Sequence, residues 1–240
     1  MTVHGLPAYV AQPAEGVAPK GIAVILSDVF GWSCVNNRVL AHYYAANGDF
    51  LVYLPDFMNG CSVPPSLIPS IEHVLEHAPT WIDFFTKPIR GIYVLARVLP
   101  SILRANIWVA WPGHVMTLAR DDPTTRVVRH EPQSGASTDP QPLVDCLFTA
   151  HPSMLNIPGD AEYVRLPTSV VVGDIDTMLK LDSARVMKSI LDSKDGHEMV
   201  ILPSAKHGFV IRTPPDGEHA KECAQEPRDQ AVAWFNKAFS

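Results

Sequence analysis

The chain has 240 residues, of which 47% are hydrophobic and 18% are charged, and its formal net charge is −6 at pH 7. This length and apolar content are enough to bury a large core, so we expect one domain over residues 1–240. The acidic balance and the absence of a basic run in the sequence exclude nucleic acid as an expected partner. No apolar run approaches the ~20 residues that a membrane span needs, so we expect no membrane partner.

The first residues and the cysteines both point to a reducing compartment. The N-terminal segment lacks the basic and apolar stretches of a signal peptide. Cys34, Cys61, Cys146 and Cys223 show no C-x-x-C spacing. In a chain without an export signal, such scattered cysteines are typical of free thiols. We therefore expect a cytoplasmic protein.

Strand and helix patterns alternate along the chain. In chain order we expect strands over 21–26, 50–54, 107–110, 144–149, 169–172 and 198–202, and helices over 38–47, 90–103, 182–193 and 220–238. This order predicts an α/β fold with a mostly parallel central sheet and helices on both faces. The continuous apolar run at 21–26 predicts a strand buried on both faces. The polar, proline-rich stretch 121–142 is interpreted as a loop insertion.

Polar and aromatic residues follow the ends of these strands. They are Asp28, Trp111, His151, Asp176 and His207. Because ligands of parallel sheets bind beyond the carboxyl ends of the strands, we expect the site at this rim. Asp176 and His207 together have the pattern of the acid and base of a hydrolytic triad. We predict that their side chains lie within hydrogen-bond reach.

The nucleophile of such a triad is missing from its expected place. The strand at 107–110 should lead into a G-x-S-x-G or G-x-C-x-G elbow, but Trp111-Pro112-Gly113-His114 follows instead. Proline cannot adopt the positive φ that an elbow nucleophile needs, and it has no N–H to donate to an oxyanion. We therefore expect simple activated esters to be turned over barely above background.

Several blocks of the sequence resemble the dienelactone hydrolase family, especially its fungal branch. In chain order they are Ser27-Asp28-Val29-Phe30-Gly31-Trp32, Asn36-Asn37-Arg38, Leu54-Pro55-Asp56-Phe57 with Gly60, His151-Pro152-Ser153, Gly173–Asp176 and His207-Gly208-Phe209. The resemblance implies an α/β-hydrolase fold, with a cap-like segment at about 60–90. It also implies a Cys-His-Asp triad, with the acid at Asp176 and the base at His207.

The same resemblance assigns two further positions. Asp28 stands where the family holds a carboxylate that interacts with the nucleophile. The family cysteine falls at Trp111 when the sequences are aligned on Gly113, and at Pro112 when they are aligned on Ala110. The elbow is therefore the point at which this chain departs from the family.

No cofactor or metal is expected. The sequence contains neither a G-x-G-x-x-G nor a Walker pattern, so nucleotide cofactors are unsupported. The stretch His73-Val74-Leu75-Glu76-His77 matches the H-x-x-E-H zinc pattern. A zinc site would also need a third ligand and a longer helix than Pro69 and Pro79 allow. We favour a solvated helix face.

The main expectation is a cofactor-free enzyme that transfers protons. Its substrate would be a small polyketide- or lactone-like secondary metabolite, which it would isomerise, cyclise, decarboxylate or open by elimination. His207 would be the base, Asp176 would orient it, and Asp28 would be a second acid. The expected substrate-binding residues are Trp32, Trp81, Trp111, His151, Cys34 and His114.

Alternative interpretations remain open at this point. The protein is a hydrolase of an ester or lactone if Cys34 or a water activated by His207 replaces the lost nucleophile, or it is a binding protein without catalysis. Asp28 is equally well explained as a loop cap, and His151 as a donor to a loop carbonyl. We interpret Ser27 and Ser153 as loop hydrogen bonders. A homodimer is a further open possibility.

Overall fold

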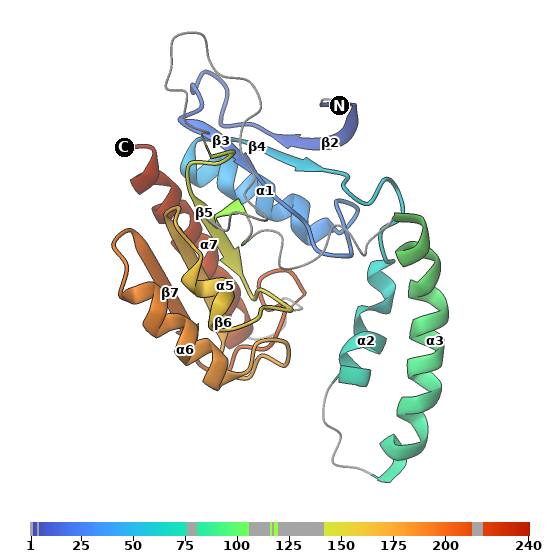
Figure 1. The fold of residues 1–240 in the computed structure, drawn as a ribbon. Helices are drawn as coiled ribbons and strands as arrows, with labels where there is room; N and C mark the ends of the chain where they lie inside the picture. The colour runs from blue at the N-terminus through green and yellow to red at the C-terminus, as the bar shows by residue number, and fades with distance from the viewer. Residues whose placement is uncertain are drawn as a thin grey trace. The chain divides into compact units, whose positions relative to one another are not determined.

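The computed structural model describes residues 2–3, 5–75, 81–105, 116, 118–119, 142–212 and 218–240. The chain divides into two compact units, Met1–Trp111 and Pro112–Ser240 (Figure 1). The expectation of one domain over 1–240 stays a prediction. The expected strand at 107–110 and nearly all of the expected insertion at 121–142 lie outside the described residues.

The first unit is built on a four-stranded sheet with the order β1-β2-β4-β3. Its strands are β1 (Thr2–Val3), β2 (Leu6–Ala11), β3 (Gly21–Val24) and β4 (Phe50–Pro55). β3 and β4 are parallel, whereas β2 runs antiparallel to β4. The burial expected for the 21–26 run is wrong, because Ile22 and Val24 are 60% and 54% exposed. The reason is that, among the described elements, β3 packs on β4 and no helix packs closely on it.

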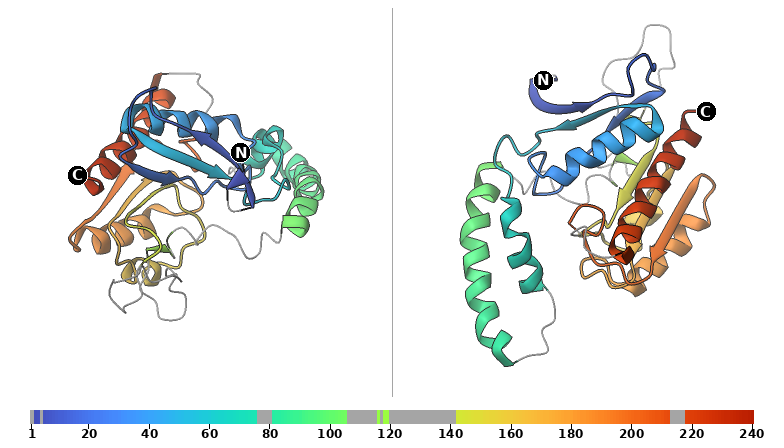
Figure 2. Two further views of the ribbon diagram at one scale, coloured as in Figure 1. Left: turned by 90° about the horizontal axis from the view of Figure 1, so that it is seen from above. Right: turned by 180° about the vertical axis from the view of Figure 1, so that it is seen from behind.

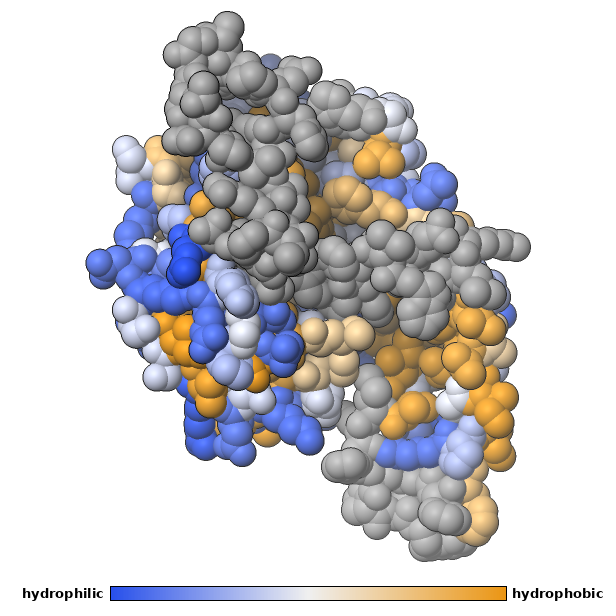
Figure 3. All heavy atoms as spheres, viewed as in Figure 1, coloured by the Kyte–Doolittle hydropathy of each residue, from blue (hydrophilic) through white to orange (hydrophobic). Residues whose placement is uncertain are grey.

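Helices complete the first unit. They are α1 (Val35–Gly48), the short η1 (Pro65–Leu67), α2 (Ile68–Leu75) and α3 (Trp81–Ala105). α1 packs on β2 and β4, while α2 and α3 pack on each other within the expected cap-like stretch (Figure 1). Figure 3 shows apolar side chains gathered over α2 and α3, and Phe85, Ile89 and Ile92 of α3 are each more than 60% exposed.

The second unit contains a three-stranded parallel sheet with the order β5-β6-β7. Its strands are β5 (Leu147–Ala150), β6 (Thr168–Gly173) and β7 (His197–Leu202), and its helices are α5 (Gly159–Glu162), α6 (Leu181–Asp192) and α7 (Glu218–Ala238). α6 covers one face of the sheet and α7 the other (Figure 2). The central strand β6 is buried along its whole length, as its run of β-branched residues predicts.

The core of the second unit explains why these three strands hold a fixed position. Val170 and Val172 of β6, Met199 of β7 and Met187 of α6 are all at most 1% exposed and form one cluster. Parallel strands in one sheet present their carboxyl ends at the same edge. The loops that follow β5, β6 and β7 therefore start from one rigid edge. In the described parts of the chain, no helix is long and apolar enough to cross a membrane.

Candidate active site

Three consecutive strand ends supply the candidate site. His151 comes directly after β5, Asp176 follows β6, and His207 follows β7. The loops are anchored to the sheet by backbone bonds that extend its ladder, since His151 N–H donates to Val171 O and Asp174 N–H donates to Leu202 O. The expected rim therefore exists in the second unit.

Asp176 and His207 form the contact that the sequence predicts. His207 Nδ1 lies 2.9 Å from Asp176 Oδ2 and 3.1 Å from Oδ1. The Asp176 side chain is fully buried, and that of His207 is 10% exposed. A carboxylate only accepts, so Nδ1 donates and Nε2 keeps its lone pair. The prediction of hydrogen-bond reach is confirmed.

Backbone amides hold Asp176 in its charged form. Asp176 Oδ1 accepts the N–H groups of Met178 at 2.7 Å and Leu179 at 3.1 Å. Burial alone would raise the pKa of Asp176, but the hydrogen bond and charge of His207, together with these two amides, outweigh it and lower the pKa below its ordinary value. The site therefore contains a fixed anion next to the imidazole.

A glycine lets the loops after β6 and β7 come together. A Cβ atom on Gly173 would lie 1.9 Å from the carbonyl oxygen of Ala205, which is far inside van der Waals contact. Only glycine permits this approach. Ala205 stands two residues before His207, so Gly173 sets the distance between the strand that leads to Asp176 and the loop that carries the base.

Ser153 completes a chain of three side chains, and its earlier interpretation as a simple loop hydrogen bonder is wrong. Ser153 Oγ lies 3.3 Å from His207 Nε2. Because Nδ1 carries the proton that Asp176 accepts, the serine hydroxyl is the donor to Nε2. The order Ser153–His207–Asp176 thus has the connectivity of a Ser-His-Asp triad.

His151 lies against His207 as a neutral ring. The ring centroids of the two histidines are 5.1 Å apart, with an interplanar angle of 72°, and Phe209 contacts the His151 ring in the same edge-to-face manner. Burial lowers the pKa of His151 to about 3, and repulsion from His207, when that ring is protonated, and from Arg212 acts in the same direction. His151 therefore adds no charge beside the base at neutral pH.

The sequence-predicted residues of the first unit have separate environments. Asp28 Oδ1 accepts the N–H of Phe30 at 3.0 Å, as in an Asx turn. Cys34 is 5% exposed and packs with Val29 and Phe30 in an apolar cluster, which is the usual environment of a structural cysteine. Trp32 is partly buried. The burial of Cys34 gives no support to its role as a nucleophile.

Other expected residues fall outside what the structure describes. Trp111 and His114 are among the undescribed residues, and of Trp81 only the backbone of α3 is described. The H-x-x-E-H stretch is described only as far as Leu75. Within the described residues, no group of three or more His, Cys, Asp or Glu side chains has a metal-binding arrangement.

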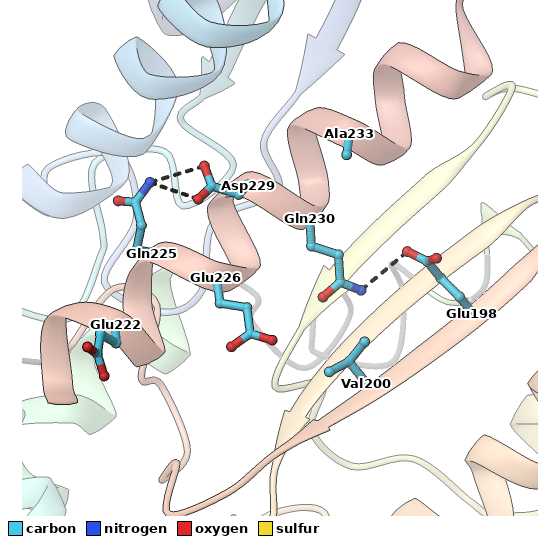
Figure 4. Close-up of a pocket in the computed structure, with 8 residues that line it drawn as sticks. All are labelled: Glu198, Val200, Glu222, Gln225, Glu226, Asp229, Gln230 and Ala233. Carbon is cyan, nitrogen blue, oxygen red and sulfur yellow. Dashed lines mark hydrogen bonds between the residues drawn. The ribbon is translucent and has the colours of Figure 1, made fainter.

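A groove in the second unit is separate from these residues. It lies between β7 and α7 and is lined by Glu198, Val200, Glu222, Gln225, Glu226, Asp229, Gln230 and Ala233 (Figure 4). Its polar groups bind one another, since Gln225 donates to Asp229 and Gln230 donates to Glu198. None of its described lining residues is a histidine, serine or cysteine, so the groove offers no nucleophilic hydroxyl or thiol.

Comparisons with known proteins find hydrolases. No family model matches the chain. Hydrolase pyvD of Aspergillus violaceofuscus is 25% identical, covering 97% of this chain and 86% of that protein. The carboxymethylenebutenolidase homolog of Xenopus tropicalis is 22% identical, covering 98% and 88%. A crystal structure assigned as a dienelactone hydrolase of Klebsiella pneumoniae has a TM-score of 0.55 at 18% identity, covering 96% and 92%.

The structural similarity defines the class: the chain has an α/β-hydrolase fold. Within that class, the resemblance to the dienelactone hydrolases is confirmed, as is the expectation of an enzyme. The curated relatives named above are hydrolases. The comparisons therefore support hydrolysis, the alternative interpretation, better than the main expectation of proton transfer.

Proposed function

We propose that this protein hydrolyses an ester or lactone bond of a small metabolite. His207 is the general base that takes a proton from the attacking hydroxyl, and Asp176 holds the ring with Nε2 free. The observation that carries the proposal is the buried Asp176–His207 pair, in which His207 Nε2 lies 3.3 Å from the hydroxyl of Ser153.

The lactone class is supported by a relative's name. A carboxymethylenebutenolidase is named for opening an unsaturated lactone, and its homolog matches this chain over nearly all of its length. Hydrolysis of such a ring needs a base, an acid for the leaving oxygen and a charge-stabilising group. The His207 imidazole serves as base and then as acid, because it gives back the proton that it receives.

Isotope incorporation separates hydrolysis from proton transfer. Purified protein is incubated in H₂¹⁸O with 4-nitrophenyl acetate and, separately, with a 4-carboxymethylene butenolide, and the products are analysed by mass spectrometry. We expect an acid product with ¹⁸O and a rate that depends on His207. A converted lactone without ¹⁸O would support isomerisation instead, and no conversion of either compound would contradict the proposal.

Other expectations remain predictions from the sequence. They are the substrate's place in secondary metabolism and its polyketide character, the cytoplasmic location and the homodimer. The proposed reaction does not depend on any of them. Asp28 is not assigned a step in it, because its described hydrogen bond is that of a turn.

A further inference from the structure

The hydroxyl of Ser153 is held against the base of the candidate site. It lies 3.3 Å from His207 Nε2, while Asp176 accepts from the opposite ring nitrogen. A nucleophile, a base and an orienting acid in this order are the signature of covalent acyl transfer, and the first distance is often looser in a structure without substrate. We infer that Ser153 is the nucleophile of the hydrolytic reaction, an inference that rests on the proposed function.

The backbone fixes the position of this serine. His151 and Met154 have left-handed φ values of 41° and 55°, which are uncommon for residues other than glycine. They stand on either side of Pro152, which is buried, and Ser153. Left-handed residues on both sides of a rigid proline are maintained only where the surrounding structure requires them. The segment thus turns sharply at the end of β5 and presents the serine at the rim.

Exposure to solvent increases along the triad from Asp176 to Ser153, as catalysis requires. The Asp176 side chain is fully buried and that of His207 is 10% exposed, while Ser153 is partly buried and the next residue, Met154, is 68% exposed. A substrate can therefore reach the hydroxyl, whereas the acid is shielded from water. Shielding strengthens the hydrogen bond that orients the base.

The residue after Ser153 has a backbone N–H. In α/β-hydrolases the N–H of the residue after the elbow nucleophile donates to the oxyanion. Met154, which follows Ser153, has an N–H, whereas Pro112, which follows Trp111, has none. The sequence 151–154 thus offers a hydroxyl followed by a residue with an N–H, a combination that the elbow lacks when the family nucleophile is aligned with Trp111.

The reaction balances with these groups and one water. Ser153 Oγ bonds to the carbonyl carbon, its proton passes to His207 Nε2, and the carbonyl π electrons move to oxygen. The bond to the leaving oxygen then breaks, and that oxygen takes the proton from Nε2. Water attacks the acyl-serine and gives a proton to Nε2, the acyl–oxygen bond breaks, and Oγ recovers that proton as the carboxylic acid leaves.

A covalent probe locates the nucleophile. The full chain is treated with diethyl 4-nitrophenyl phosphate, release of 4-nitrophenolate is followed, and the modified peptide is identified by mass spectrometry. We expect the phosphoryl group on Ser153 and no adduct in Ser153→Ala. Hydrolysis of 4-nitrophenyl acetate should fall at least ~10³-fold in Ser153→Ala. Ser193→Ala is the matched control, because Ser193 is exposed and donates to Ile190 O.

The outcomes separate this inference from the proposed function. If Ser153→Ala keeps its activity while His207→Ala loses it, hydrolysis stands and Ser153 is not the nucleophile. If the wild-type protein neither cleaves the ester nor accepts the phosphoryl group, both the function and the inference are wrong.

A second variant covers the case in which Ser153→Ala fails to fold. In Ser153→Cys, iodoacetamide should alkylate the introduced thiol faster than the four natural cysteines, and adding His207→Ala should slow that alkylation. A rate that does not depend on His207 would contradict the inference.

Discussion

Asp28, in the loop after β3, and the polar side chains that follow β5, β6 and β7 all lie at strand ends, but their described hydrogen bonds differ in reach. Asp28 accepts from Phe30, two residues away, and Gly31 N–H donates to the Asp28 carbonyl. In the second unit, Asp176 binds a histidine 31 positions later, and that histidine binds a serine 54 positions earlier. The first pattern shapes one turn, and the second joins three strands.

This difference indicates where chemistry is to be expected. A side chain that accepts from an amide of its own turn has the hydrogen bond of a structural cap, which by itself indicates no chemistry. Where side chains from separate strands meet, they can act together on one reactive atom, which here is Nε2 of His207. We therefore assign catalysis to Ser153, His207 and Asp176, as proposed above, and turn formation to the described hydrogen bond of Asp28.

Asp176→Asn is expected to have the largest effect on kcat, and it directly tests the contrast between Asp176 and Asp28. The amide can donate to Nδ1, which would stabilise the wrong tautomer and remove the lone pair from Nε2. We expect the kcat for 4-nitrophenyl acetate to fall by ~10³–10⁴-fold. Asp174→Asn, on the same loop, is the control and should keep its activity. Equal losses in the two variants would show that the loop as a whole matters, and not the Asp176 carboxylate.

Gly173→Ala should separate the two catalytic loops. The new methyl group would collide with the carbonyl oxygen of Ala205, 1.9 Å away, so the backbone must move. We expect the free energy of unfolding to fall by ~1–3 kcal/mol, with a lower kcat because the base is displaced. Gly159→Ala, where no atom lies closer than 3.9 Å to the added Cβ, should unfold like the wild type. Chemical denaturation and steady-state kinetics measure both.

His151 should make stability depend on pH in the mildly acidic range. Its folded pKa of about 3 lies below the ordinary histidine value of ~6.5, so the unfolded chain takes up the proton first. The stabilisation is complete above about pH 6.5 and is lost progressively as the pH falls towards 3. Relative to His151→Phe, the wild type should lose stability steadily as the pH falls through this window, by roughly 1 kcal/mol per pH unit. If urea denaturation gave the wild type and His151→Phe the same dependence of stability on pH, the burial of a neutral His151 ring would be contradicted.

Asp28 substitutions should have the smallest effects. Asp28→Asn keeps an oxygen that can accept the N–H of Phe30, so activity and thermal stability should remain close to wild type. Asp28→Ala removes the acceptor and should cost about 0.5–1.5 kcal/mol in stability, with kcat unchanged. A large fall in kcat for Asp28→Asn, with stability kept, would instead place this carboxylate in the reaction.

The sequence predicts the pair Asp176–His207 because both follow apolar strands of a parallel sheet, and parallel order alone brings such strand ends together. The elements around them are also predictable. β6 extends one residue beyond the expected strand at each end, and α6 is shifted by one residue towards the N-terminus. Strand β2 is missed, because it runs antiparallel to β4 and so stands outside the alternating strand–helix pattern from which the others are inferred.

Ser153 is not predictable from the same reasoning. Its side-chain direction depends on the left-handed φ of His151, and no residue type in the stretch His151-Pro152-Ser153 announces that conformation. Its position was the one signal for Ser153. The hydroxyl lies three residues after β5, at the edge of the sheet where the site is expected. The expectation that activated esters are poor substrates assumed that only the elbow can supply a nucleophile, and the Ser153–His207 contact removes that assumption.

The most direct test of the account compares two histidines associated with one strand. His197 begins β7, and His207 follows its carboxyl end. The kcat/KM for 4-nitrophenyl acetate should fall by ~10²–10⁴-fold in His207→Ala, the usual contribution of a positioned base, and should stay near wild type in His197→Ala. Full activity in a folded His207→Ala protein would contradict the assignment of catalysis to this site.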